Sequence, residues 1–171
     1  NDGSLEVNFD IYDYTYDDLQ LNYFNAATFA YRTLNAEESE SRGLEIQVAY
    51  LPPLIDGLRL TAAYGYNDSN YVKFVGPCAG GQKPSEGCNV PDGGLTLQNL
   101  NGSKKALAPE NRLNLGINYN SILRSGLELG FNMNLKASDD YRLSDTIPDI
   151  KQPRYNTVDA GISLSSPTAG W

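Results

Sequence analysis

Side chains that could carry out chemistry are few in this chain of 171 residues. Histidine is absent, which removes the most common general base and the most common metal ligand. The only two cysteines, Cys78 and Cys88, lie among glycines and prolines. Two such thiols can close a disulfide or offer two thiolates to a metal. No catalytic arrangement is visible, so we expect no enzyme activity and no cofactor.

Acidic residues dominate the charge of the chain. The 13 Lys and Arg against 21 Asp and Glu give a formal net charge of −8. This balance excludes nucleic acid as a partner, because phosphate binding needs a basic face. Adjacent acidic pairs occur at 17–18, 37–38 and 139–140. None has the alternating Asp/Asn spacing of a calcium loop, so we expect solvated surface charge there.

Apolar and polar residues alternate with a period of two in six segments, as in strands that have one apolar face. These predicted strands cover residues 5–12, 44–50, 58–66, 112–120, 127–136 and 158–165. No segment of comparable length has the 3.6-residue period of a helix. The sequence therefore predicts an all-β chain.

The connections between the predicted strands alternate in length. Residues 51–57 and 121–125 form short turns, whereas residues 13–41, 69–109 and 137–154 form long loops. In an antiparallel up-and-down sheet every second connection lies at the same end, so the short turns share one end and the long loops the other. Outer-membrane β-barrels have this asymmetry, with short periplasmic turns and long extracellular loops.

The polar faces of the predicted strands carry charges such as Glu6, Asp10 and Glu45. Unpaired charges are too costly to bury, so this face must meet water or a polar surface and the apolar face must meet lipid or a second layer. Six strands at about 4.8 Å spacing span an arc of about 29 Å, too short to close around a hydrated lumen. The chain is therefore predicted to be part of the wall of a larger transmembrane β-barrel.

Tyrosine is the most frequent aromatic residue, with 12 copies. Near the outer ends of the predicted strands lie Tyr12, Tyr14, Tyr16, Tyr64, Tyr66 and Tyr141. Barrels place aromatic residues at the membrane–water interfaces, so we expect these side chains to form the outer girdle. The alternative, that Tyr is simply a good strand former with an amphipathic tip, stays open.

Several segments resemble the barrel of a TonB-dependent outer-membrane receptor. Residues 35–45 (NAEESESRGLE) are the most specific match, similar to the family's N-A-x-x-x-x-S-x-G-hydrophobe-E segment. Residues 7–14 and 58–71 resemble the flanking strands, 108–112 resembles the a-P-x-n start of the next inward strand, and 155–171 resembles the strand and turn before the last two strands. The resemblance covers nearly the whole chain.

This resemblance implies a 22-stranded barrel in the bacterial outer membrane, surrounded by lipid and filled by an N-terminal plug domain. Residues 1–171 would be part of that one barrel domain, with the plug domain and the final strands outside this sequence. Coupling to an inner-membrane energy-transducing complex would drive uptake of a scarce ligand such as a ferric siderophore, cobalamin or an oligosaccharide. A passive porin, or a soluble disulfide-bearing β-module that binds glycan or protein at the cell surface, remains an alternative.

In a receptor, the ligand contacts should come from the outer loops and the upper lumen, where aromatic and Arg side chains can grip a sugar, a chelate or a planar anion. The candidates are Tyr14, Tyr16, Tyr71, Arg142 and Arg154. On an oxidising cell surface we expect Cys78 and Cys88 to form a disulfide, and closing a loop of roughly 11 residues contributes about 3 kcal/mol in the chain-entropy model. Metal binding by the two thiols is the alternative.

Overall fold

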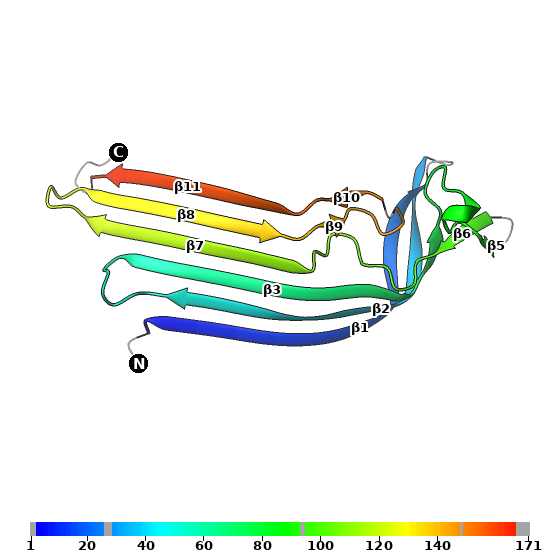
Figure 1. Cartoon of the computed structure of the whole chain (residues 1–171), viewed down its shortest axis with the longest axis horizontal. Coiled ribbons are helices and arrows are strands. Elements are labelled where there is room, and N and C mark those ends of the chain that lie inside the picture. The colour runs from blue at the N-terminus through cyan, green and yellow to red at the C-terminus, as the bar shows by residue number, and fades with distance from the viewer. Residues whose placement is uncertain (1–2, 26–28, 93–94, 148, 167–171) are drawn as a thin grey trace.

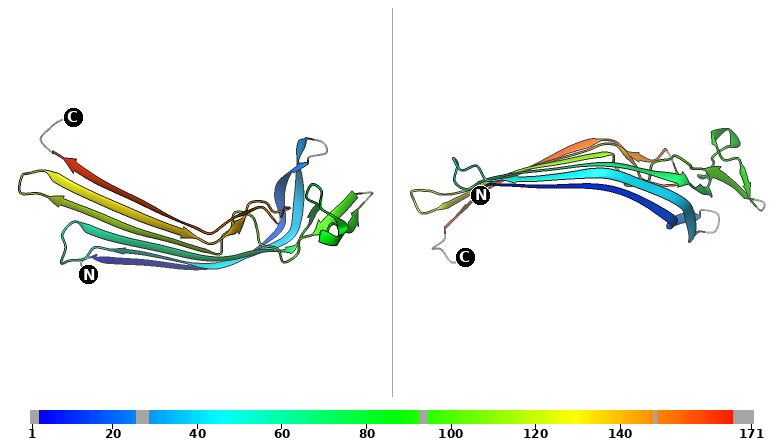
Figure 2. Two further views of the ribbon diagram at one scale, coloured as in Figure 1. Left: turned by 45° about the horizontal axis from the view of Figure 1, so that its top comes forward. Right: turned by 90° about the horizontal axis from the view of Figure 1, so that it is seen from below.

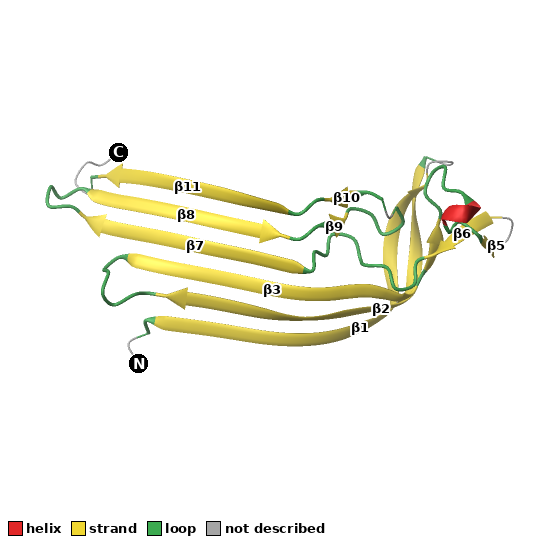
Figure 3. Ribbon diagram, in the orientation of Figure 1, coloured by secondary structure: helices red, strands yellow, loops and turns green. Residues whose placement is uncertain are grey.

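One antiparallel sheet of six long strands dominates the chain (Figures 1 and 3). A computed structural model describes residues 3–25, 29–92, 95–147 and 149–166. The long strands are β1 (Leu5–Asn25), β2 (Ala30–Tyr50), β3 (Leu58–Lys73), β7 (Asn111–Ile122), β8 (Glu128–Ser138) and β11 (Tyr155–Ser165). Each pairs with the next long strand along the chain, which confirms the predicted up-and-down order.

The connections divide between the two ends of this sheet as predicted. Short turns join β2 to β3 and β7 to β8 at one end, while the smaller elements gather at the other (Figure 1). These smaller elements are β4 (Val75–Pro77), the 3₁₀ helix Pro84–Glu86, β5 (Val90–Asp92), β6 (Leu95–Asn99), β9 (Tyr141–Arg142) and β10 (Lys151–Gln152). Within the described ranges, no helix has the length and apolar composition needed to cross a membrane.

The first long connection is a hairpin, so the prediction of a loop over residues 13–41 is wrong. β1 and β2 stay paired from Asp13 opposite Arg42 to Asn25 opposite Ala30. Asp18 in β1 has a φ of 54°. The outer part of the hairpin turns away from the plane of the sheet (Figure 2). Alternation could not reveal this part, because a strand beyond the membrane need not have one apolar face.

Cross-strand register collects the apolar side chains on one face of the sheet, here called the apolar face. Ile11 lies opposite Leu44, which in turn lies opposite Tyr66. Further along the sheet the same face carries Leu115 opposite Leu135. No layer formed by the described residues covers these side chains, and Ile11 is 73% exposed. Such a continuous, uncovered apolar face matches the lipid-facing wall of a transmembrane barrel.

The apolar face ends sharply at a charged row formed by Asp13, Arg42 and Asp68. This row lies one step beyond Ile11, Leu44 and Tyr66 on the same face. Arg42 contacts Asp13 at 3.1 Å and, through its second guanidinium nitrogen, Glu40 at 3.0 Å. We infer that the hydrocarbon of the bilayer ends between the two rows, because charged side chains on the lipid face cost least near the interface.

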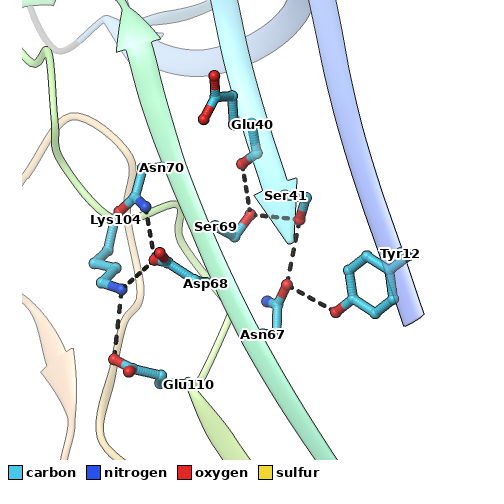
Figure 4. A network of polar contacts seen from close by, with 9 residues as sticks. All are labelled: Tyr12, Glu40, Ser41, Asn67, Asp68, Ser69, Asn70, Lys104 and Glu110. Carbon is cyan, nitrogen blue, oxygen red and sulfur yellow. Dashed lines mark hydrogen bonds and ion pairs between the residues drawn. The ribbon is translucent and has the colours of Figure 1, made fainter. Parts of the chain in front are cut away.

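Asp68 is held by a partner from the second long connection (Figure 4). Lys104 Nζ lies 2.7 Å from Asp68 Oδ1 and 3.4 Å from Glu110 Oε2. Asn70 also donates to Asp68 Oδ1, at 2.7 Å. The second connection therefore bonds to the sheet just beyond the apolar face.

A small apolar core lies at the outer end of the sheet, beyond the charged row. Buried Ala36, Tyr71, Phe74 and Leu100 form it, and three partly buried leucines of the β1–β2 hairpin pack against it. The Tyr71 and Phe74 ring centroids are 4.7 Å apart. This core joins the first hairpin, the end of β3 and the second connection into one packed unit.

The predicted disulfide between Cys78 and Cys88 is confirmed, with Cα atoms 5.5 Å apart. It joins the residue that follows β4 to the segment that leads into β5. Both thiols are consumed by this bond, so the alternative of a two-thiolate metal site is wrong.

A charge placed on the apolar face tests its contact with lipid. In the full-length protein we expect Leu115→Arg to destabilise the folded barrel by about 2–4 kcal/mol, because Leu115 lies in the middle of that face. Asn114→Arg, one residue away on the opposite face, is the matched control and should cost little. Refolding into vesicles at several urea concentrations measures both, and equal costs would contradict the assignment of the faces.

Removing the disulfide tests its role in the second connection. For Cys78→Ser/Cys88→Ser we expect a loss of about 3 kcal/mol in local stability from the larger conformational freedom of the open segment. Limited proteolysis should then cut the protein between residues 78 and 88 faster than before. The stability of the barrel in urea should be unchanged, and a parallel loss there would show that the disulfide supports more than its own connection.

Candidate functional site

β1 carries a row of three tyrosines on the face opposite the apolar one, here called the polar face. Tyr12, Tyr14 and Tyr16 have the same parity as Glu6 and Asp10, since the β1–β2 register is unbroken from Leu5 to Asp17. Ring centroids of Tyr12 and Tyr14 are 5.5 Å apart with nearly parallel planes, and those of Tyr14 and Tyr16 are 6.1 Å apart. The tyrosine row therefore lines the side that faces the lumen of a barrel.

The expected outer girdle thus divides between two faces. For the tyrosine row the girdle prediction is wrong. Tyr12 directly follows Ile11 in the strand, so its side chain points to the face opposite the lipid-facing one. Tyr64 and Tyr66 do lie on the apolar face, opposite Ile46 and Leu44. Tyrosine consequently has two uses in this sheet, one toward lipid and one toward the lumen.

Hydrogen bonds and a glycine fix the inner end of the tyrosine row (Figure 4). The Tyr12 hydroxyl donates to Asn67 Oδ1 at 3.0 Å, and Ser41 Oγ donates to the same atom at 3.2 Å. Gly43 lies directly opposite Tyr12, and a Cβ there would overlap the Tyr12 hydroxyl and the Tyr66 carbonyl oxygen. Glycine at position 43 therefore lets the Tyr12 ring lie across β2.

Lys105, from the second connection, closes the outer end of the row. Its Nζ lies 4.9 Å from the centroid of the Tyr16 ring, within the range of a cation–π contact. Burial lowers the pKa of the Lys105 amine, and the charge of Asp145 opposes that effect. Tyr14 and Tyr16 remain 53% and 44% exposed. The surface offers aromatic faces beside a positive charge, an arrangement suited to a planar anion.

Two of the predicted contact residues, Tyr71 and Arg142, are buried at 1% and 9% exposure. The Tyr71 hydroxyl donates to Asp145 Oδ1 at 2.7 Å. Burial and this bond raise the pKa of Tyr71 well above its usual value. Arg142 donates to the carbonyl oxygens of Lys104 and Asp145. In this conformation both side chains join the outer connections to one another.

Arg154 lies apart from the tyrosine row. It is exposed, precedes β11, and lines an open hollow together with Tyr64 and Asn111. β1 and β11 are the opposite edges of the six-stranded sheet. The structure therefore brings together Tyr14 and Tyr16 among the predicted contacts. It adds Tyr12, which the sequence had assigned to the outer girdle, and Lys105, which no sequence signal indicated.

Further toward the inner end, the polar face of the sheet contains a shallow hollow of about 280 Å³. Glu6, Arg59 and Lys136 lie around it, and the small residues Thr61 and Gly116 lie within it. Among the described residues, no group of three or more His, Cys, Asp or Glu side chains is placed to hold a metal ion. The wall is polar and uneven, as expected of a surface that meets water or another polar protein surface.

Comparisons with known proteins identify the family. The family model "TonB dependent receptor-like, beta-barrel" matches residues 1–170. BauA, the ferric preacinetobactin receptor from Acinetobacter baumannii, aligns with a TM-score of 0.63 at 16% identity, over 98% of this chain and 21% of its own. PiuA, a siderophore receptor from the same organism, aligns with a TM-score of 0.60 at 18% identity, over 94% of this chain and 20% of its own. The search of curated proteins gave no match.

At these identities the two solved receptors establish the fold, and the chain spans about a fifth of their length. The family match agrees with the alternation, the loop asymmetry and the uncovered apolar face. It favours an outer-membrane receptor over the passive porin and over the soluble β-module, and the family consists of receptors and transporters, not enzymes. The chain is thus a section of barrel wall in the outer membrane of a Gram-negative bacterium, and it belongs to the TonB-dependent receptor family.

Proposed function

We propose that the protein containing this chain takes up a ferric siderophore across the outer membrane in an energised step. The observation that carries this proposal is the tyrosine row with Lys105 over Tyr16. These side chains lie on the polar face, at the end of the sheet that bears the long connections. The fold similarity to BauA and PiuA, both siderophore receptors, supports the same ligand class.

The chemistry of the row favours a chelate over the other expected ligands. Flat aromatic faces stack on the planar rings of iron-binding groups, and an ammonium beside a ring attracts their negative charge. An oligosaccharide would use the aromatic faces but has no need of Lys105. Cobalamin could also use the rings, but no feature of the row favours it.

The spacing of the row suits stepwise capture. Neighbouring ring centroids are 5.5 Å and 6.1 Å apart, so a ligand that leaves Tyr16 can stack on Tyr14 before it loses contact. Tyr12, at the inner end, is held by a hydrogen bond to Asn67, and its ring is the last one on which the ligand could stack. A ligand would thus move from the outer connections toward the lumen along a continuous aromatic surface, without any covalent step.

Transport itself would require parts outside this sequence. We infer that an N-terminal plug domain of the same protein covers the polar face, because Glu6, Arg59 and Lys136 must meet water or a polar partner. The shallow hollow around these residues gives such a domain an uneven surface to fit. An inner-membrane energy-transducing complex would act on that plug to release the captured ligand.

Binding of a ferric tris-catecholate complex tests the ligand site. In the full-length protein we expect Tyr14→Ala/Tyr16→Ala to raise its Kd about 5- to 150-fold, because each aromatic contact contributes about 0.5–1.5 kcal/mol beyond its area burial. Calorimetric titration of the detergent-solubilised protein measures this change. Tyr64→Ala, which removes a tyrosine from the apolar face, is the matched control and should leave the Kd unchanged.

Two outcomes would contradict the proposal. The first is an equal loss of affinity in Tyr64→Ala, which would remove the special role of the tyrosine row. The second is binding of cobalamin or a malto-oligosaccharide by a protein that binds neither ferric catecholates nor ferric hydroxamates.

A further inference from the structure

Two neighbouring lysines of the second connection point to opposite faces of the sheet. Lys104 reaches the apolar side, where it contacts Asp68 of the charged row and Glu110 (Figure 4). Lys105 reaches the polar side, where its Nζ lies over the Tyr16 ring. The backbone at these two residues therefore decides which amine faces the lumen.

Hydrogen bonds from the third connection hold the backbone on both sides of Lys105. Arg142 Nη1 donates to the carbonyl oxygen of Lys104 at 3.3 Å, and the amide of Ala106 donates to Asp145 Oδ1 at 2.7 Å. The Lys105 amide itself donates to the carbonyl oxygen of Ser69 in β3, at 3.0 Å. Three consecutive residues are thus bonded to elements that are distant in the sequence.

Arg142 and Asp145 use their charged groups in an unusual way. Arg142 is buried, yet among the described residues no carboxylate lies within ion-pair distance of it, and the hydrogen-bond acceptors of its guanidinium are backbone carbonyls. Its Nε likewise has no hydrogen-bond partner among the residues that the structure describes. Asp145 Oδ1 accepts from both Tyr71 and Ala106. Arg142 is thus a buried charge held by backbone groups, and the best-attested use of such a charge is to specify one geometry. Asp145 is half-buried and bonds to two groups at once.

We propose that Arg142 and Asp145 are positioning residues that hold Lys105 over the tyrosine row, so that the site selects anionic planar ligands over neutral ligands of similar shape. The proposal rests on the proposed function for its ligand class. Lysine has a long, flexible side chain, so its amine is presented at one place only if the backbone beneath it is fixed. Arg142, expected from the sequence to touch the ligand, would then act through Lys105.

Comparing an anionic with a neutral ligand distinguishes two roles for Arg142 and Asp145. They either position Lys105 or only stabilise the connections in general. In the full-length protein, the Kd is measured for a ferric tris-catecholate, which is anionic, and for a ferric tris-hydroxamate, which is neutral. Arg142→Ala, Asp145→Ala and Lys105→Gln should each weaken the anionic complex about tenfold, the loss of one charge-assisted contact, and the neutral complex less than twofold. Asp145→Asn keeps an acceptor oxygen for Tyr71 and Ala106, and should behave as the parent protein.

A spectroscopic measurement tests the positioning without any ligand. Reductive ¹³C-methylation labels lysines and keeps their charge, and the ring current of Tyr16 should displace the Lys105 methyl resonance. Tyr16→Leu identifies that displacement by removing it. We expect Arg142→Ala and Asp145→Ala to abolish the displacement and Asp145→Asn to keep it.

The two measurements distinguish two kinds of failure. A parent protein that binds neither complex, with the Lys105 displacement lost in Arg142→Ala, overturns the proposed function and the ligand selection while leaving the positioning intact. A displacement that survives in both alanine variants overturns the positioning. Equal weakening of the anionic and neutral complexes in those variants also overturns it, because it shows general support of the connections.

Discussion

Pairing of every backbone N–H and C=O inside the bilayer is the constraint on which the rest of this structure depends. Hydrocarbon offers no water to satisfy these groups, so the strands of a barrel wall must pair with their neighbours. Pairing in turn fixes the alternation of side chains, one face to lipid and one to the lumen. The register is unbroken from Leu5 to Asp17 where β1 pairs with β2, and from Ser39 to Tyr50 where β2 pairs with β3.

Beyond the bilayer, water can satisfy backbone groups and strict pairing is no longer required. The strands become irregular at one level of the sheet. Asp18 takes a positive φ in β1, and the β2–β3 register shifts between Glu38 and Ser39. Both irregularities lie outward of the row of Asp13, Arg42 and Asp68, at the level where Asp17 pairs with Glu38. Outward of this level apolar side chains turn inward, as in the core of Tyr71 and Phe74, because here water lies outside and the ordinary hydrophobic effect applies.

Alternation therefore predicted the part of the chain that lipid constrains and failed where that constraint ends. The six strands, their order and the Cys78–Cys88 bond all followed from the sequence. The β1–β2 hairpin did not, because beyond the bilayer no lipid requires one face of a strand to be continuously apolar. Parity alone could have placed Tyr12 on the polar face, since it follows Ile11 directly. Lys105 gave no such signal, because its direction depends on contacts with Arg142 and Asp145, which lie far along the chain.

The candidate site lies where these two regimes meet, and this explains its mixed construction. The strand pairing of β1 determines the face to which the three tyrosine side chains point, so their positions are as fixed as the barrel wall. The direction of the Lys105 side chain depends on the second connection. Tertiary contacts, and not strand alternation, set the geometry of that connection. Lys104 and Lys105 are adjacent, yet Lys104 anchors the connection to Asp68 of the charged row and Lys105 supplies the proposed ligand contact in the lumen. Connections can change in evolution while the barrel stays intact, so ligand preference can shift at the connection while the aromatic surface remains in place.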